Sequence, residues 1–356
     1  MSVLLELAET ETRALVLGNP ARRASLPEGC IGNNGLPGPA AEGVIAAILA
    51  ELGADGGPVT LLLPPRLVRT RCVQLDVPID GPITHAHLSD AHAALADCAD
   101  LQREATLYAQ PGRYLIDGVP TTEDPTGHRC ATLSIEVPIL TANLSALAAL
   151  EKAIVSGGAT LTDVITPQVP SAAAFIGETQ TGAVLVFGHG ETLLLVAAED
   201  RLQRAATIPI GFRHLVGDLM KTLDVGAAEA RESVAAHQLL RAQAKRLEDA
   251  IIKARLDELC EAIIDRASDL TRDFDVTFVA RAGSPGAEHV LPALIDELPD
   301  ELVTADQTSG DDPYAVLQGA ASVLEGLRGG HEPASLSLRA EGQRRHAVLQ
   351  WLVTHF

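Results

Sequence analysis

Histidine and carboxylate side chains gather in one short stretch of the sequence, where they could bind a metal ion. His85, His87 and His92 lie close together, with Asp90 between them. Imidazole and carboxylate groups are ligands that Zn²⁺ accepts in proteins. The stretch spans a turn and the start of a helix, however, and no second pair of ligands follows at a familiar spacing. We therefore expect no metal site here.

Other catalytic chemistry is sparse as well. The residues from Gly182 to Gly190 contain no Gly-x-Ser-x-Gly motif, and no serine, histidine and acid follow the order that a hydrolase uses. The cysteines are odd in number, far apart and free of Cys-x-x-Cys pairs, which argues against a zinc knuckle and a disulfide framework. They are Cys30, Cys72, Cys98, Cys130 and Cys260. We expect reduced and mostly buried thiols.

The overall composition excludes several classes of protein. The net charge of -20 repels phosphate backbones, so general nucleic-acid binding is not expected. Hydrophobic residues make up 47% and charged residues 21%, as in ordinary globular proteins. Apolar runs such as Leu193–Ala198 are too short to span a membrane, and Glu6 precedes any signal-peptide core. We expect a globular chain that stays in the cytosol.

The last residues of the sequence differ from the rest in character. On a helix from Gly342 to Phe356, large apolar side chains share one face and arginines lie near the N-terminal end. The residues of this candidate membrane-binding segment are Arg344, Arg345, Val348, Leu349, Trp351, Leu352 and Phe356. The pattern is typical of an interfacial helix on anionic lipid, although a helix docked on the protein's own core has the same period. The preceding Gly/Pro-rich linker favours the membrane. One such helix binds weakly, and self-association would strengthen it through avidity.

Helices and strands alternate along most of the chain, which indicates an α/β fold. We expect strands at 3–7, 13–17, 59–63, 161–166, 183–186, 192–197 and 276–280. We expect helices at 41–52, 144–155 and 171–176, from 211 onward, over most of 227–270, and at 313–327.

The stretch 71–139 differs from this alternation and predicts a small α+β insertion. It contains a strand at 72–79, a turn at 80–82, a helix at 89–99 with Ser89 as its N-cap, and strands near 103–108 and 114–116. Before it, Arg66, Arg69 and Arg71 are expected on a solvated edge.

Four segments, in order, resemble FtsA, the actin-related bacterial protein that tethers the tubulin-like FtsZ to the membrane. They are TRCVQLDVPIDGPITHAHLSDAHAAL with YLIDGVPTTEDPTGHRCATLSIEVPIL, then GAVLVFGHGETLLLVAAEDRLQRAATIPIGFRHLVGDLMKTLDVGAAEA, then IIKARLDEL, and finally QWLVTHF. The first pair is similar to the family's 1C insertion, the second segment to its phosphate-2 hairpin and connecting helix, the third to a helix of subdomain 2B, and the last to its amphipathic helix.

The resemblance implies an actin-like, ribonuclease H-like fold of two α/β lobes. The insertion would stand in the first lobe in place of actin's subdomain 1B. The expected divisions are 1–68 and 140–170 for the first lobe, 69–139 for the insertion, 171–226 and 273–328 for the second lobe, 227–272 for a helical subdomain, 329–341 for a linker and 342–356 for the membrane-targeting helix.

Several residues that an actin-type ATPase needs are absent. Such enzymes hold Mg-ATP between two hairpins whose glycines admit the phosphates and whose aspartates organise the metal and water. The first hairpin motif, Asp-x-Gly-Thr in the family, corresponds to Glu6-Leu7-Ala8-Glu9, followed by Glu11. The second motif, Asp-x-Gly-Gly-Gly-Thr-Thr-Asp, retains Gly188, Gly190 and Thr192, but its aspartates correspond to Val186 and Leu193. Hydrolysis is therefore not expected.

Further losses follow along the chain. Phe212 replaces a glycine, Glu232 replaces a lysine, and the adenine-side Gly-Gly loop reads Arg281-Ala282-Gly283. The surviving candidate nucleotide-binding residues are Gly188, Gly190, Thr192, Gly211, Glu229 and Gly283. These glycines either still hold ATP and Mg²⁺ weakly or are turn glycines that need a positive φ. We favour the second interpretation.

Partner binding is implied by the resemblance alone. The matching helix of the family receives the acidic and apolar tail of FtsZ, so Arg255 would pair with a tail carboxylate and Glu258 with a tail donor. An ordinary ion pair within the helix is the alternative. The insertion would contact later divisome proteins. The function implied is a peripheral tether of the division ring on the inner face of the cell membrane. A pilus-assembly actin-like adaptor and a still-active actin-fold ATPase are the alternatives.

Overall fold

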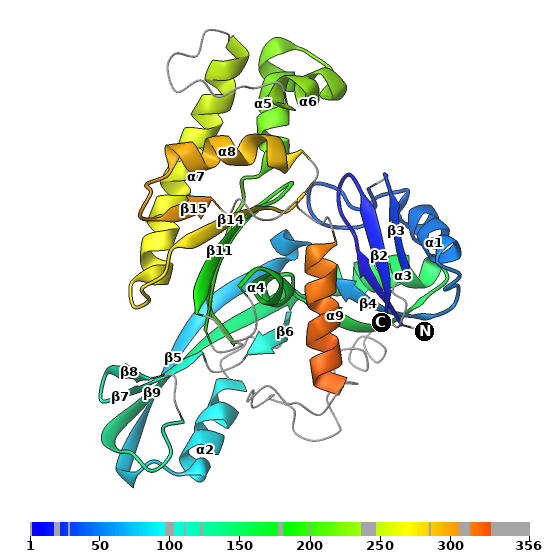
Figure 1. Cartoon of the computed structure of the whole chain (residues 1–356). Coiled ribbons are helices and arrows are strands. Elements are labelled where there is room, and N and C mark those ends of the chain that lie inside the picture. The colour runs from blue at the N-terminus through cyan, green and yellow to red at the C-terminus, as the bar shows by residue number, and fades with distance from the viewer. Residues whose placement is uncertain are drawn as a thin grey trace.

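The computed structural model describes most of the chain between Ser2 and Arg328. The described residues are 2–17, 22–27, 29–96, 103–109, 112–121, 124–176, 181–198, 201–235, 247–284, 286–305 and 314–328. They form two lobes, each built on a five-stranded sheet, and an insertion with a third sheet (Figure 1). The linker and helix expected at 329–356 lie outside the described residues.

The first lobe is built on a five-stranded sheet with β1 at its centre. Its order is β10 (Thr160–Ile165), β4 (Pro58–Leu62), β1 (Ser2–Glu6), β2 (Thr12–Leu17) and β3 (Arg22–Leu26). Side chains alternate between the two faces of a strand. Val3 and Leu5 therefore share a core with α1 (Ala41–Glu51) and α3 (Leu144–Ser156), whereas Leu4 packs with α9 (Ala315–Arg328). The central strand is thus buried on both faces.

The second lobe repeats this arrangement. Its sheet order is β13 (Arg201–Ile208), β12 (Thr192–Ala198), β11 (Gly182–Phe187), β14 (Phe278–Ala282) and β15 (Val303–Ala305). The side chains of Leu185 and Phe187 share a core with α5 (Phe212–Leu223), α7 (Leu247–Thr271) and α8 (Ala287–Glu297). Val184 and Val186 face the opposite side, where α4 (Gln168–Ile176) links them to the core of the first lobe. One apolar core therefore runs between the lobes.

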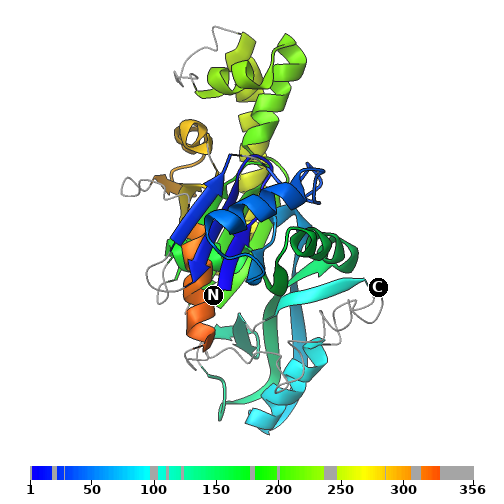
Figure 2. The ribbon, with the colours of Figure 1, turned by 90° about the vertical axis from the view of Figure 1, so that its right-hand side faces the viewer.

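A helical arm and the insertion lie at opposite ends of the molecule (Figure 2). The arm consists of α5, α6 (Ala227–Ala235) and α7. The insertion contains two strands of 15 residues each, β5 (Val68–Pro82) and β9 (Arg129–Asn143), which pair antiparallel along most of their length. Beside them lie β6 (Glu104–Ala109), β7 (Arg113–Ile116), β8 (Val119–Thr121) and α2 (His85–Ala96).

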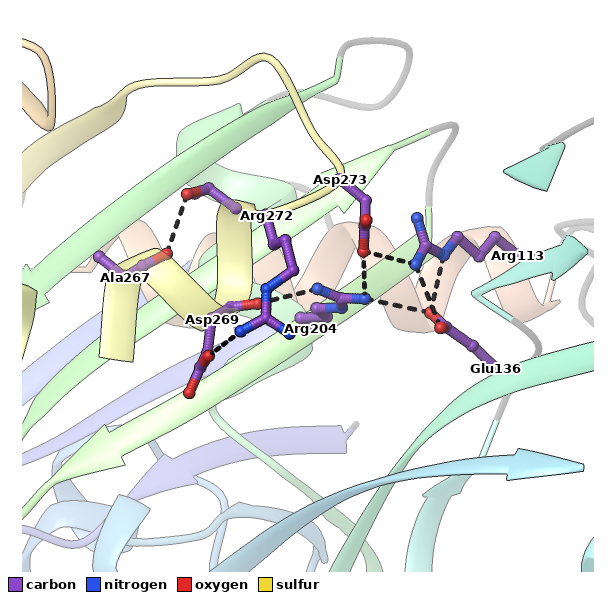
Figure 3. Close-up of polar contacts among 8 residues, drawn as sticks. Arg113, Glu136, Arg204, Ala267, Asp269, Arg272 and Asp273 are labelled. Carbon is purple, nitrogen blue, oxygen red and sulfur yellow. Dashed lines mark hydrogen bonds and ion pairs between the residues drawn. The ribbon is translucent and has the colours of Figure 1, made fainter. Parts of the chain in front are cut away.

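Four charged side chains join the insertion to the second lobe (Figure 3). Arg113 of β7 donates to Glu136 of β9 at 2.7 and 3.1 Å, and to Asp273 at 2.7 Å. Arg204 of β13 donates to the same two carboxylates, at 3.3 Å to Glu136 and 2.8 Å to Asp273. Both guanidinium groups also lie over the ring of Phe274. Charged groups from four separate stretches of the chain therefore meet in one place.

The pKa values of the two carboxylates reflect this network. Burial acts to raise the pKa of Glu136, but the hydrogen bonds and charges of Arg113 and Arg204 outweigh it, so the net shift is downward. A hydrogen bond from Arg113 also lowers the pKa of Asp273. Both groups are therefore ionised at neutral pH.

The structure corrects the sequence predictions for the insertion. The turn predicted at 80–82 is wrong, because β5 continues to Pro82 through a shift in pairing register between Pro78 and Gly81. Gly81 has a φ of +108°, which a glycine adopts without strain. The N-cap prediction is wrong too. Ser89 lies inside α2, and Thr84 accepts a hydrogen bond from the backbone of His87 instead.

Most of the other predicted elements are confirmed, with ends that differ by a few residues. None of the predicted ranges corresponds to β3, β8, β9, β13, β15 or α8. Helix α8 contains Pro292 and follows Gly283 and Gly286, and such residues ordinarily mark a loop. Its apolar face, with Val290 and Leu294, packs on the core of the second lobe. Tertiary packing therefore outweighs the local helix-breaking signals.

Cysteine burial agrees only in part with expectation. Cys30 and Cys260 are buried, whereas Cys72 is exposed and Cys130 is partly exposed. Cys98 lies outside the described residues. No helix among the described residues is both long and apolar enough to cross a membrane.

Candidate functional site

Two hairpin turns face each other across the lobes. The first turn, Leu7–Glu11, follows β1, and the second turn, Gly188–Glu191, follows β11. Both turns line a cleft with residues of the two lobes, and its free volume is about 100 Å³. Ligand pockets commonly measure roughly 300–1,000 Å³, so this cleft is narrow.

Arg66 fills the space between the two turns. This residue follows β4, and its Nη2 lies 2.9 Å from Oε1 of Glu9 in the first turn. Its Nε also contacts Oε1 of Glu191 in the second turn. All three side chains are nearly buried, at 13% exposure for Arg66, 10% for Glu9 and 9% for Glu191. Burial raises the pKa of Glu191, and the charge of Arg66 acts against this shift.

The prediction that Arg66 lies on a solvated edge is therefore wrong. The prediction holds for Arg69 and Arg71, whose side chains are 72% and 44% exposed on β5. Both of these arginines also bind the buried carboxylate of Glu104. Arg66 differs because Pro64 and Pro65 end β4 at the rim of the cleft and direct the chain across it.

His189 and Arg213 complete the polar cluster at the second turn. His189 Nε2 lies 3.6 Å and Arg213 Nε 3.9 Å from Oε2 of Glu9. Burial, reinforced by the charges of Arg213 and Arg231, lowers the pKa of His189 to about 4. The ring is therefore neutral at pH 7, and its contact with Glu9 is not an ion pair.

The shifted pKa of His189 predicts a pH-dependent stability. The unfolded chain binds a proton at this ring near pH 6.5, whereas the folded chain does so only near pH 4. Between these values the unfolded state holds more protons, so the free energy of unfolding falls as the pH falls, by about 3 kcal/mol in total. The variant His189→Gln should lack this component, as measured by urea unfolding between pH 7 and pH 4. A His289→Gln control at an exposed ring should keep it, and equal pH slopes for all three proteins would contradict the assignment.

The surviving glycines are required for close packing rather than for a positive φ. None of Gly188, Gly190, Gly211 and Gly283 has a positive φ. The prediction that these glycines are needed for a positive φ is therefore wrong. A Cβ at Gly211 would lie 2.7 Å from three backbone atoms of the second turn. A Cβ at Gly190 would lie 2.0 Å from Nη2 of Arg66. These glycines let the protein's own atoms meet in the cleft.

Only some of the candidate nucleotide residues lie at the cleft. Gly188, Gly190 and Gly283 line it. The hydroxyl of Thr192 is buried and donates to the backbone oxygen of Ile210 at 2.8 Å. Glu229 is exposed on α6 and does not line the cleft. Sequence reasoning missed Arg66 and Arg213, and the proline pair before Arg66 is the signal that could have indicated its position.

The residues of the cleft do not fit ATP with Mg²⁺. The face of Gly190 that a phosphate would approach is covered by the guanidinium group of Arg66. The carboxylates of Glu6, Glu9 and Glu191 line the same narrow space and would repel a triphosphate. Phe212 does not line the cleft, because its ring packs in the core of the second lobe.

The other candidate residues lie apart from the cleft. Arg255 of α7 donates to Asp218 of α5 at 2.7 Å and to Glu258 at 2.5 Å, so the ion pair within the helix exists. Glu258 is 58% exposed and remains accessible to a partner. No cluster of metal-ligating side chains occurs among the described residues, which leave out the side chain of His92. The candidate membrane residues from Arg344 to Phe356 lie outside them.

Known structures identify the fold. A chain of the PilM-PilN type IV pilus biogenesis complex superposes with a TM-score of 0.64 at 16% identity, covering 90% of this chain and 98% of that one. MreB5 of Spiroplasma citri bound to ADP gives a TM-score of 0.50 at 10% identity, covering 92% of this chain and 98% of that one. No protein-family model matches the chain. The protein has the two-lobed actin-like α/β fold, as predicted.

Sequence similarity gives a closer relationship. The cell division protein FtsA of Agrobacterium fabrum is 27% identical over 233 residues, which cover 64% of this chain and 49% of that protein. The chain is therefore an FtsA-like protein of the actin fold, and the resemblance stated from the sequence is confirmed. It spans about half the length of the curated relatives it matches.

Proposed function

We propose that the protein tethers FtsZ to the inner face of the cell membrane and helps to organise the division ring, with little or no ATPase activity. The similarity to FtsA over 64% of the chain is the observation that carries this proposal. The arginines and apolar side chains of 342–356 support contact with anionic lipid. The narrow, carboxylate-lined cleft supports the lack of hydrolysis.

The exposed end of the Arg255–Glu258 pair supports the arm as the surface for FtsZ. Glu258 is largely exposed, and Arg255 is 25% exposed beside it. An acidic tail could take one donor of the guanidinium while Asp218 keeps another, because the group has a fork of donors. Weak lipid and FtsZ contacts would gain strength when several copies assemble.

Co-sedimentation with anionic liposomes tests the two ends of the tether. Full-length protein should bring FtsZ to the vesicles, whereas a chain ending at Glu341 should leave both in solution, because it lacks the apolar face. The variant Glu258→Ala should bind vesicles but recruit FtsZ several-fold less. Lys253→Ala, at an exposed ion pair of the same helix, is the matched control. Vesicle binding by the shortened chain would contradict the membrane assignment.

A pilus-assembly adaptor is the second candidate. The structural match to the PilM-PilN complex covers 98% of that chain and favours it, whereas the FtsA match covers 49% of its relative. The same experiment separates the two. Full-length protein that binds vesicles but not FtsZ, and instead recruits PilN from the same cell, would favour the adaptor.

A further inference from the structure

The polar cluster in the cleft joins parts of the chain that belong to different lobes. Arg66 and Glu9 lie in the first lobe, whereas Glu191 lies in the second, directly before β12. In actin-type proteins a nucleotide and its metal bridge these two hairpin turns. We propose that Glu9, Arg66 and Glu191, here called the Arg66 clamp, hold the two turns together in place of a nucleotide. This inference concerns the cleft alone and does not depend on the tether proposal.

The geometry of the guanidinium group suits this role. Its planar fork presents separate donors, so Nη2 can bind Glu9 while Nε binds Glu191. Charge-assisted hydrogen bonds of this kind are stronger than neutral ones, and solvent screens them little because all three side chains are nearly buried. One guanidinium group therefore binds a carboxylate from each lobe, and Arg213, 3.9 Å from Glu9, adds a second positive charge nearby.

The surrounding residues are adapted to the clamp. Gly190 lacks the Cβ that would lie 2.0 Å from Arg66, so the glycine leaves the guanidinium its place. Backbone hydrogen bonds hold the second turn in place: the N–H of Phe212 donates to the oxygen of Gly188 at 3.0 Å, and the N–H of Arg213 donates to that of His189 at 2.8 Å. Each of the two turns thus supplies one carboxylate to Arg66.

The charges also explain why Arg66 cannot be lost without consequence. Glu9 and Glu191 repel each other, and this repulsion acts to raise the pKa of Glu191. Without Arg66, two carboxylates would face one another in a nearly buried space, and the turns would move apart to hydrate them. The shared apolar core beneath the cleft would still connect the lobes, so the opening should be local.

Hydrogen exchange of the full chain, read by mass spectrometry, tests the clamp. In Arg66→Ala the backbone amides of Gly188, Phe212 and Arg213 should exchange at least about tenfold faster, because their hydrogen bonds depend on the position of the second turn. Arg69→Ala, a neighbouring arginine on the exposed strand, should leave these rates unchanged. Adding Mg-ATP to the wild-type protein should not slow them.

Two further variants keep the test decisive if Arg66→Ala destabilises the whole protein. Glu191→Gln preserves size and removes one charge, and it should speed exchange at the second turn while leaving α7 unchanged. Exchanging the charges, with Arg66→Glu and Glu191→Arg together, should restore more protection than Arg66→Glu alone. Unchanged exchange at the second turn in Glu191→Gln would overturn the proposal. Strong protection of both turns by Mg-ATP would overturn it as well, since a nucleotide would then be the bridging group.

Discussion

Replacing Arg113 with alanine is expected to lower the free energy of unfolding by about 3 kcal/mol. Removing one member of a buried ion-pair network typically costs about 3–5 kcal/mol, because the partner charges stay buried without full compensation. The side chain of Arg113 is 6% exposed, and that of Glu136 is 15% exposed. Arg204 still contacts Glu136 and Asp273 in this variant, which places the expected loss at the lower end of the range. Urea unfolding at pH 7 measures the effect.

Arg272→Ala is the matched control for this prediction. Arg272 lies beside the network in Figure 3 and pairs with Asp269, but both side chains are more than half exposed. Exposed pairs contribute about 0–1 kcal/mol, so the control should lose less than about 1 kcal/mol of unfolding free energy.

The low pKa values of Glu136 and Asp273 add a second readout. These carboxylates stabilise the fold above their unfolded pKa values, and this stabilisation is lost in acid. The free energy of unfolding of Arg113→Ala should therefore fall less steeply than that of the wild type between about pH 5 and pH 2. Equal losses in the two variants would show that the network does not fasten the insertion.

The substitution Gly211→Ala should cost about 3 kcal/mol. Its Cβ would lie 2.7 Å from the Glu191 nitrogen and from the backbone oxygens of Gly188 and His189. Real Cβ atoms do not approach backbone so closely, so the start of α5 must move away from the second turn. Overpacking of this kind typically costs about 1–3 kcal/mol, and the backbone contacts here leave little room to adjust. A thermal or urea unfolding measurement on the full chain checks the loss.

Gly217→Ala in the same helix gives the opposite expectation. A Cβ there meets no atom within 4 Å, and alanine favours a helix interior over glycine by about 0.5–1 kcal/mol. The variant should therefore be more stable than the wild type. The two glycine-to-alanine substitutions, six residues apart, would then change the free energy of unfolding in opposite directions. Destabilisation of similar size at both positions would mean that helix α5, rather than its contact with the second turn, sets the cost.

The sequence was informative where local patterns decide the structure. The paired strands around the first turn, the helix from Ala41 and the buried strand at β4 all follow from apolar spacing and from Gly or Pro punctuation. The loss of the phosphate-site aspartates could also be recognised, because Glu6, Val186 and Leu193 stand at definite places in two motifs. These features depend on residues that are close together in the chain.

The sequence was uninformative where distant residues meet. Nothing local to Arg66 indicates Glu191 as its partner, so an arginine in a charged stretch is naturally assigned to the surface. The same holds for Arg113 and Asp273, which lie 160 residues apart. Helix α8 was missed because its glycines and Pro292 outweigh its apolar period locally, whereas the core of the second lobe provides the compensating packing. The partners of these arginines and the packing that stabilises α8 become apparent only in the folded structure.

The direction of α9 has a mechanical consequence. This helix begins at the cleft, where Val316 lines it, and runs along the first lobe, whereas α5 begins on the other side of the cleft and leads into the arm. In the tether proposed above, a pull between lipid-bound residues 342–356 and a partner bound to the arm would pass from one lobe to the other. The ion pairs of Arg66 lie on that path. Under that proposal they would carry part of the tension, together with the apolar core that the lobes share, and this connection would not depend on a bound nucleotide.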